Sequence, residues 1–395
     1  MNTSTAHATA IQPGRATGSR APSVLGSLWR ATHSFRPVLL LLVAICVFLS
    51  IWQDGFLTTV NTQNIATSVA VLWLIALGAT FVQLSGGIDL SSGAIAAIAG
   101  ICLTHLLDTG VPDGIVIVLV VLFGAAIGAI VNGILVGVVG LNVFVVTLAS
   151  MTAITGVVSL WSGTRSTFVF SEAVNKLAID ELLGLAMPVW IMAATFLLFL
   201  FVQTRTYFGR DIYAIGGSMT AAKLSGIRTA RTLLIVWGVA GAMAALAGVI
   251  AVGRIGASAP QPDNTLPLNA IAAILLGGSA LTGGMGGVGG TALGVLFIGV
   301  LQNGLSLSGA PTYWQQIVTG FILVAAVLGD RLQSHPGWIN FTRRFHRSSR
   351  PDPVSATDAV AVEVAVPEAG PTPGTEEART DRASLMAGGT RPGTH

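Results

Sequence analysis

The chain has 395 residues, of which 52% are hydrophobic and only 9% are charged. Soluble domains carry roughly a quarter of charged residues, so a chain this apolar lacks the polar surface that folding in water requires. Its formal net charge of +3 comes from Lys and Arg residues in the two termini and one central loop. These residues form no single basic face, which argues against nucleic acid as a partner. The composition indicates an integral membrane protein.

Residues 1–36 are polar, and we expect a cytoplasmic N-terminal segment without a signal peptide. The region 37–332 that follows consists mostly of apolar runs. A helix needs about 20 apolar residues to cross the roughly 30 Å of hydrocarbon, and several runs approach that length. The runs are 37–52, 64–84, 90–107, 115–139, 143–161, 186–203, 231–252, 268–281, 288–307 and 314–329.

These runs predict an all-α polytopic membrane protein with about ten transmembrane helices. The runs 90–107 and 268–281 are short and interrupted by glycine. Each of these two is a full span, a broken helix or a re-entrant segment.

The placement of charge predicts the orientation. Basic residues gather in the N-terminal segment, in the gap 204–231 and in the flank after residue 330, whereas the alternate gaps hold only Arg165, Lys176 and Arg254 among several acidic residues. Cytoplasmic loops carry the excess of Lys and Arg. We therefore expect both termini and the gap 204–231 to be cytoplasmic.

The spacing of the apolar runs also predicts two pseudo-repeated halves. The run, glycine-rich break and short run near 64–107 have counterparts near 231–290. Paired, interrupted segments of this kind point to a solute path between the halves. Residues 333–395 form the expected cytoplasmic tail, which is rich in Pro, Ala, Thr, Glu, Asp and Gly from about residue 348 and is expected to be disordered there.

The segment 85–93 reads SGGIDLSSG and places Asp89 at the end of an apolar run. An acidic side chain at this depth is costly unless it is capped, solvated or functional. Gly86 and Gly87 allow a sharp turn, and Ser91 or nearby backbone N–H groups can bind the carboxylate. The alternatives are a cap at a helix break, direct contact with solute, and proton coupling.

The glycine-rich segment 277–290 begins with Gly277 and Gly278 and contains no lysine. A phosphate-binding loop needs Gly-Lys-Ser/Thr at its end, so close helix approach or unwound backbone lining a cavity is the better interpretation. Gly124 and Gly128 have the spacing that lets helices pack closely.

Uncharged polar residues lie within other apolar runs, and each either joins two helices or contacts a solute. As a set they suit a polyhydroxylated solute better than an ion. Cysteine, histidine and acidic residues form no recognisable catalytic or metal-binding grouping in the sequence, so we expect no enzyme activity. The polar residues are Gln83, Asn132, Thr147, Asn269, Gln302, Asn303 and Thr319.

In the gap 204–231, Gly217 and Ser218 can begin a short helix that Gly226 ends. This element is either a docking surface for a partner or an ordinary interhelical loop.

Three stretches together resemble the permease subunits of ribose- and xylose-type ABC importers, the binding-protein-dependent transport inner-membrane components. They are GIDLS at 87–91, YAIGG at 213–217 with AAKLSGI at 221–227, and AIAA at 270–273 with GGSALTGG at 277–284, Gly290, Gly294 and QNGL at 302–305. The likeness covers about residues 37–332.

The resemblance implies the ABC importer permease fold in the cell inner (plasma) membrane. Its implied partners are a second permease copy, identical or paralogous, ATPase subunits that use ATP and Mg, and an extracytoplasmic substrate-binding protein. This chain itself would bind no cofactor or metal. The implied ATPase-coupling loop comprises Tyr213, Gly216, Gly217, Ala221, Ala222, Lys223, Leu224, Ser225, Gly226 and Ile227. Candidates for the translocation path or the helix breaks are Gly86, Gly87, Asp89, Ser91, Asn269, Gly277, Gly278, Gln302 and Asn303.

Two positions depart from the family pattern. Asn269 stands where the family commonly has an acidic residue and Met285 where a basic one is frequent. Each departure removes a charge, so neither an ion-pair role at these positions nor a close assignment of the substrate is expected. The predicted function is import of a monosaccharide or related polyol. The alternatives are a permease for branched-chain amino acids or another small polar solute, and a self-contained secondary transporter in which Asp89 couples transport to an ion.

Overall fold

The fold is that of a computed structural model in which residues 36–334 are described. Helices make up nearly all of this region, which confirms the predicted all-α class. The helices are α2 (Arg36–Trp52), α3 (Thr59–Leu84), α4 (Ser92–Leu107), α5 (Asp113–Ile127), η2 (Gly128–Val138), α6 (Val143–Ser162), α7 (Glu172–Ala178), α8 (Met187–Arg205), α9 (Tyr207–Gly217), α10 (Met219–Leu224), α11 (Thr229–Ile255), α12 (Thr265–Leu276), α13 (Val288–Leu307) and α14 (Thr312–Ser334).

Four very short strands connect the helices. They form two antiparallel pairs, β1 (Thr167–Phe168) with β4 (Ala257–Ser258) and β2 (Glu181–Leu182) with β3 (Leu185–Ala186). The expectations for the N-terminal segment up to residue 35 and for the tail from residue 335 onward lie outside the described residues.

Each predicted apolar run corresponds to an apolar helix. Within the described region, six helices are long and apolar enough to cross a membrane, and α5 and η2 count among them as one continuous segment. Four apolar helices are shorter, namely α2, α4, α12 and the apolar part of α14. At about 1.5 Å per residue, the 12 residues of α12 rise only about 18 Å, which is less than the hydrocarbon thickness.

Only part of the predicted run 268–281 is helical. Helix α12 ends at Leu276, and the backbone turns at Gly278, whose φ is +84°. A positive φ costs glycine little because it has no side chain. The chain then stays non-helical until α13 begins at Val288.

The π-helical segment η2 is a feature that the sequence did not predict. It continues α5 for 11 residues and contains the buried Asn132. Gly128 at its start packs so closely on the Trp237 carbonyl of α11 that a side chain would overlap it. Segments of π-helix are rare and frequently occur at functional sites.

The long central helix of each half packs against helices of the other half. Helix α3 packs on α12 and α13 of the second half, whereas α11 packs on α4, α5 and η2 of the first half. The contacts of α4 with α6 are matched by those of α12 with α14. Helices α3 and α11 also cross each other, where Gly78 lies directly against the backbone of Ala240. This packing corresponds to the predicted pseudo-repeat.

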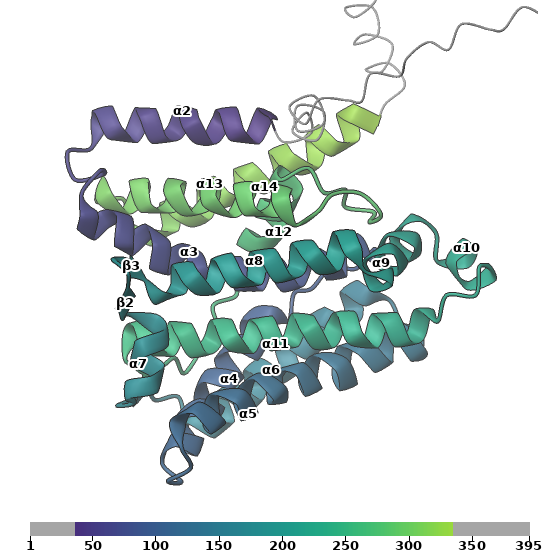
Figure 1. Ribbon diagram of the computed structural model, residues 1–395, viewed down its shortest axis with the longest axis horizontal. Coiled ribbons are helices and arrows are strands. Elements are labelled where there is room, and N and C mark those ends of the chain that lie inside the picture. Colours follow the sequence, from purple (N-terminus) through teal and green to yellow (C-terminus); the bar gives the residue numbers. More distant parts are fainter. Residues whose placement is uncertain (1–35, 335–395) are drawn as a thin grey trace, which may run out of the picture. The chain divides into compact units, whose positions relative to one another are not determined.

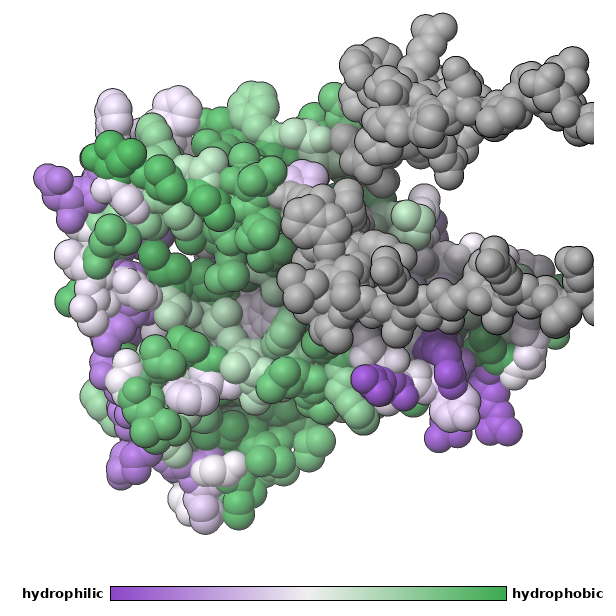
Figure 2. All heavy atoms as spheres, turned by 45° about the horizontal axis from the view of Figure 1, so that its top comes forward, coloured by the Kyte–Doolittle hydropathy of each residue, from purple (hydrophilic) through white to green (hydrophobic). Residues whose placement is uncertain are grey.

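Hydrophobic residues cover the surface between two polar ends of the molecule (Figure 2). Exposed large apolar side chains are frequent on α2, α5, α6 and α8. Such a belt suits hydrocarbon on the outside. In Figure 1 the start of α2, the end of α14 and the helices α9 and α10 lie at the right-hand end, and α7 with β2 and β3 lies at the left-hand end.

Candidate functional site

Three glycine-containing segments that are distant in the sequence meet at the end of α3. The N–H of Gly284 donates a hydrogen bond of 2.9 Å to the carbonyl of Leu84. A side chain at Gly216, in α9, would overlap that same carbonyl. Gly283 lies against Gly86, because a Cβ added to Gly283 would come within 2.6 Å of the Gly86 Cα. We call the segments 84–87, 216–217 and 283–284 the glycine junction.

Backbone conformation as well as space restricts three positions of this junction to glycine. The φ angles of Gly86, Gly283 and Gly284 are +86°, +88° and +71°. Residues with a side chain rarely adopt such angles. The junction therefore joins the end of α3, the end of α9 and the loop between α12 and α13 through direct backbone contact.

A hydrogen-bonded chain next to the junction holds the same loop. The hydroxyl of Tyr213 donates to the carbonyl of Gly286 at 2.6 Å and accepts a bond of 2.9 Å from Nε2 of Gln203. Oε1 of Gln203 accepts a bond of 2.8 Å from the N–H of Val288, the first residue of α13. We call these four residues the Tyr213 clasp.

The clasp satisfies a backbone N–H that a helix start otherwise leaves without a partner. Burial raises the pKa of the Tyr213 phenol, so its hydroxyl stays protonated at neutral pH and remains a donor. The clasp thus fixes α9 and α8 to the beginning of α13.

The segment 207–227 forms two helices. Ser218 caps α10, since its Oγ accepts a bond of 3.3 Å from the N–H of Ala221, and Gly226 turns the chain after it with a φ of +82°. This confirms the short helix expected between Gly217 and Gly226. Leu224 at the end of α10 is 85% exposed, which is unusual for a leucine outside an apolar belt.

The sequence predicts one short helix within an interhelical loop in this gap, and it does not predict helix α9. Two signals mark it. Thr206 is a favourable cap whose Oγ1 accepts from the N–H of Gly209 at 3.2 Å. The apolar residues Phe208, Ile212 and Ile215 follow with helical spacing, and the last two are buried. As a result Tyr213, Gly216 and Gly217 lie in a helix.

Asp89 is 3% exposed and forms a cap. Its Oδ1 accepts bonds of 2.8 Å from the Ser91 N–H and 2.7 Å from the Ser91 hydroxyl. Asn132 of η2 donates to the Ser91 hydroxyl at 2.8 Å, and Ser150 of α6 donates to Asn132 at 2.6 Å. Geometry therefore provides the capping role, the first of the three alternatives for Asp89.

A cavity of about 730 Å³ lies among α3, α4, α11, α12, α13 and α14. This volume is within the range of small-molecule sites. Its lining includes Asn61 near the start of α3 and Arg254 near the end of α11, so the cavity lies toward the end of the molecule away from α9 and α10 (Figure 1).

The predicted path residues separate into two groups. Asn269, Gln302 and Asn303 line the cavity. The other six do not line it and lie at the helix breaks: Gly86, Gly87, Asp89, Ser91, Gly277 and Gly278. Direct contact of Asp89 with a solute in this cavity is therefore not supported.

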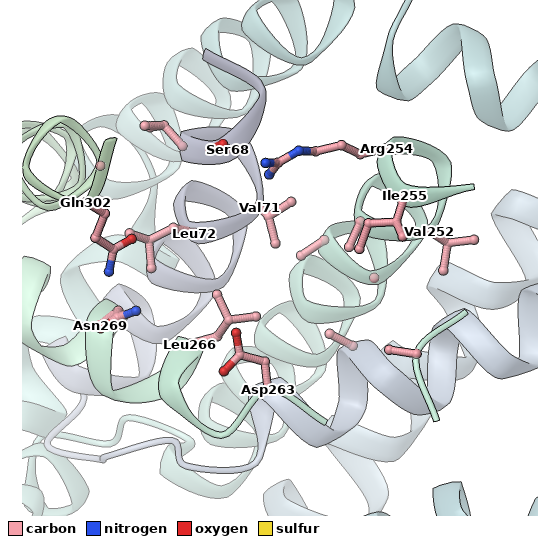
Figure 3. Close-up of a pocket in the computed structure, with 18 of the residues that line it drawn as sticks. Ser68, Val71, Leu72, Val252, Arg254, Ile255, Asp263, Leu266, Asn269 and Gln302 are labelled. Carbon is pink, nitrogen blue, oxygen red and sulfur yellow. The ribbon is translucent and has the colours of Figure 1, made fainter. Parts of the chain in front are cut away.

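Other polar lining residues were missed as site candidates. Asn61, Asn64 and Ser68 line the cavity from one face of α3, at spacings of three and four residues that a search for a polar helical stripe would find. Arg254 and Asp263 were assigned only to outer gaps, yet both line the cavity (Figure 3). Neither charge forms an ion pair within the described residues.

Asp263 has a structural role at the edge of the cavity. Its Oδ1 accepts bonds of 2.9 Å from the N–H and 2.6 Å from the hydroxyl of Thr265, where α12 begins. Both Asp263 and Arg254 are exposed, whereas Asn269 is buried. The charged groups thus lie on the more accessible part of the lining and the amide on the more buried part.

Comparison with known proteins gives the family. Residues 61–327 match the family model described as branched-chain amino acid transport system, permease component. The ribose import permease protein RbsC of Escherichia coli (strain K12) is 37% identical over 306 residues, which cover 76% of this chain and 94% of the relative. The D-allose transport system permease protein AlsC of the same strain is 37% identical over 296 residues, covering 75% and 90%.

The L-arabinose ABC transporter permease protein AraH of Azospirillum brasilense is 33% identical over 333 residues, covering 82% of this chain and 96% of the relative. No solved structure matches the chain. The family model spans most of the described helices and all three segments of the glycine junction. The chain is a multi-pass membrane protein and belongs to this family of transport-system permease components.

Proposed function

We propose that the chain is the permease subunit of an ABC importer that moves a monosaccharide or a related polyol across the cell membrane. The observation that carries this proposal is the cavity, whose buried polar lining consists of uncharged amides such as Asn269. Amides bind hydroxyl groups without a net charge on either side. The names of the three relatives, which state ribose, D-allose and L-arabinose, support the same class of solute.

The docking element for the ATPase is the pair of helices α9 and α10. Exposed Leu224 and Lys223 lie on this pair, and the clasp and the glycine junction attach it to the helices that line the cavity. A movement of the bound ATPase that displaces α9 would therefore also displace α13, through backbone contacts and hydrogen bonds. ATP and Mg would act in the ATPase, and this chain would hydrolyse nothing.

The proposed orientation has α9, α10, the start of α2 and the end of α14 on the cytoplasmic side. All four lie at one end of the helical bundle (Figure 1), and α9 with α10 lies in the basic gap. The cavity then faces the exterior, where an extracytoplasmic binding protein delivers the solute. A second permease copy, identical or paralogous, completes the transmembrane core.

Import of a branched-chain amino acid is the second candidate. The family description names this class of solute, and Arg254 and Asp263 line the cavity with charges that would suit the carboxylate and ammonium groups of an amino acid. However, Asp263 already binds Thr265, and the three relatives named above carry sugar names.

Reconstitution tests the proposal. The chain is placed in proteoliposomes with the ATPase and the binding protein of its transport system, and uptake of radiolabelled D-ribose, D-allose, L-arabinose and L-leucine is measured. We expect uptake of a sugar that requires ATP and both partners. Uptake of leucine alone would contradict the sugar assignment, and uptake by the chain alone under an ion gradient would contradict the ABC mechanism.

A further inference from the structure

One of the buried polar side chains that line the cavity, Asn269, has no partner among the described residues. Asn269 is 7% exposed, and its side-chain amide makes no hydrogen bond to any described residue. Figure 3 shows this amide directed into the cavity from α12. An amide on the wall of a cavity needs water or a solute in that cavity to occupy its hydrogen-bonding positions.

Gln302 repeats this arrangement on the neighbouring helix α13. Its amide also lines the cavity, is partly buried and forms no hydrogen bond to the described residues. In Figure 3 the two amides lie on the same side of the cavity, across from Arg254. Leu72 and Leu266 provide apolar surface beside them.

A second pair of amides in the same cavity, Asn61 and Asn303, has a structural role, because the two side chains bond to each other. Nδ2 of Asn61 donates to Oδ1 of Asn303 at 3.1 Å, and Nδ2 of Asn303 donates to Oδ1 of Asn61 at 2.8 Å. Asn61 also donates to the carbonyl of Phe56 at 2.9 Å. These amides satisfy each other and join α3 to α13.

We infer that Asn269 and Gln302 form a subsite that binds hydroxyl groups of a neutral polyol, whereas Asn61 and Asn303 serve the fold. Each free amide offers both a donor and an acceptor, which matches a hydroxyl group that also donates and accepts. The adjacent leucines contact the C–H faces of the solute. The inference rests on the proposed function and names the residues of this chain that select the solute.

The charge distribution of the subsite restricts the solute class. Asn269 and Gln302 are uncharged, and Arg254 lies on the opposite side of the cavity and is exposed. A carboxylate or ammonium group held at Asn269 would be desolvated without an opposite charge beside it, which is costly. The subsite therefore favours a sugar over an amino acid.

The test compares Asn269→Leu with Asn303→Leu, because leucine has nearly the shape of asparagine but no hydrogen-bonding groups. Uptake of radiolabelled D-ribose, D-allose and L-arabinose is measured in proteoliposomes with the ATPase and the binding protein, and thermal unfolding of each purified permease is measured in detergent. For Asn269→Leu we expect uptake of the transported sugar to fall about 5- to 10-fold at an unchanged or higher unfolding temperature.

For Asn303→Leu we expect mainly a lowered unfolding temperature, because Asn61 loses both of its hydrogen bonds to residue 303. Asn269→Ser keeps a hydrogen-bonding group and should restore part of the uptake that Asn269→Leu loses. Wild-type uptake by Asn269→Leu, or a loss of stability as large as that of Asn303→Leu, would overturn the inference. Absence of sugar uptake by the wild-type complex would instead overturn the proposed function.

Discussion

The hydroxyl of Tyr213 donates a hydrogen bond of 2.6 Å to the carbonyl of Gly286, and this bond joins a surface helix to the loop before α13. Helix α13 carries Gln302 and Asn303 of the cavity near its other end. The proposed coupling requires that a displacement of α9 be transmitted along α13 to the cavity lining. The glycine junction provides a parallel contact from Gly216 to the end of α3.

Tyr213→Phe removes the donor of this bond and leaves the ring in place. We expect a loss of about 0.5–1.5 kcal/mol of stability and a reduced ratio of sugar uptake to ATP hydrolysis, because the loop is no longer held to α9. Both rates are measured in proteoliposomes. Tyr207→Phe is the matched control, since Tyr207 is 80% exposed in the same helix. An unchanged ratio for Tyr213→Phe would remove the clasp from the coupling mechanism.

Gly216 and Gly217 are adjacent, yet the structure gives them opposite tolerance to substitution. A Cβ at Gly216 would overlap the Leu84 carbonyl, whereas a Cβ at Gly217 would meet nothing within 4 Å. We expect Gly216→Ala to destabilise the permease by about 1–3 kcal/mol through overpacking and Gly217→Ala to be nearly neutral. Thermal unfolding of the two variants measures the difference, and equal stability would contradict the glycine junction.

Two substitutions of Asp89 distinguish a capping role of its carboxylate from a role in proton coupling. Asp89→Asn retains an oxygen that accepts from the Ser91 N–H and hydroxyl, so we expect near wild-type stability and transport. Asp89→Ala removes the acceptor and leaves buried donors without a partner, at a cost of about 1–3 kcal/mol. Uptake assays with both variants distinguish the roles. Full stability with abolished transport in Asp89→Asn would favour a titrating carboxylate.

Leu224→Glu tests the docking surface. The side chain is 85% exposed, so we expect stability to change by no more than about 0.5 kcal/mol. An acidic group on the proposed contact should weaken co-purification of the ATPase with the permease. Leu183→Glu is the control, because Leu183 is 84% exposed in the turn between β2 and β3 at the opposite end. If both variants retained the ATPase equally, α10 would not be part of the interface.

Local signals in the sequence predicted much of the fold. The apolar runs located every apolar helix, because burial in lipid requires long hydrophobic segments. The cap at Asp89 and Ser91 was predictable since both partners lie within three residues. Ser218 and Gly226 likewise marked both ends of α10.

Long-range features were not predictable in the same way. The sequence identified the three glycine-rich segments separately, but their meeting at Leu84 depends on the packing of α3, α9 and the loop before α13. The roles of Asn269 and Asn303 differ because only Asn303 has an amide partner. That partner is Asn61, which is 242 residues away in the sequence. No local pattern distinguishes a paired amide from a free one.

Labelling of cysteines at the two ends of the molecule tests the central claim most directly. Lys223 of α10 and Lys176 of α7 are both exposed, and each is replaced by cysteine in a chain whose Cys46 and Cys102 are replaced by alanine. A membrane-impermeant maleimide is applied to intact cells and to inverted membrane vesicles. We expect Lys223→Cys to react only in inverted vesicles and Lys176→Cys only in intact cells. Reaction of Lys223→Cys in intact cells would contradict the orientation, the docking of an ATPase on α9 and α10, and the outward-facing cavity.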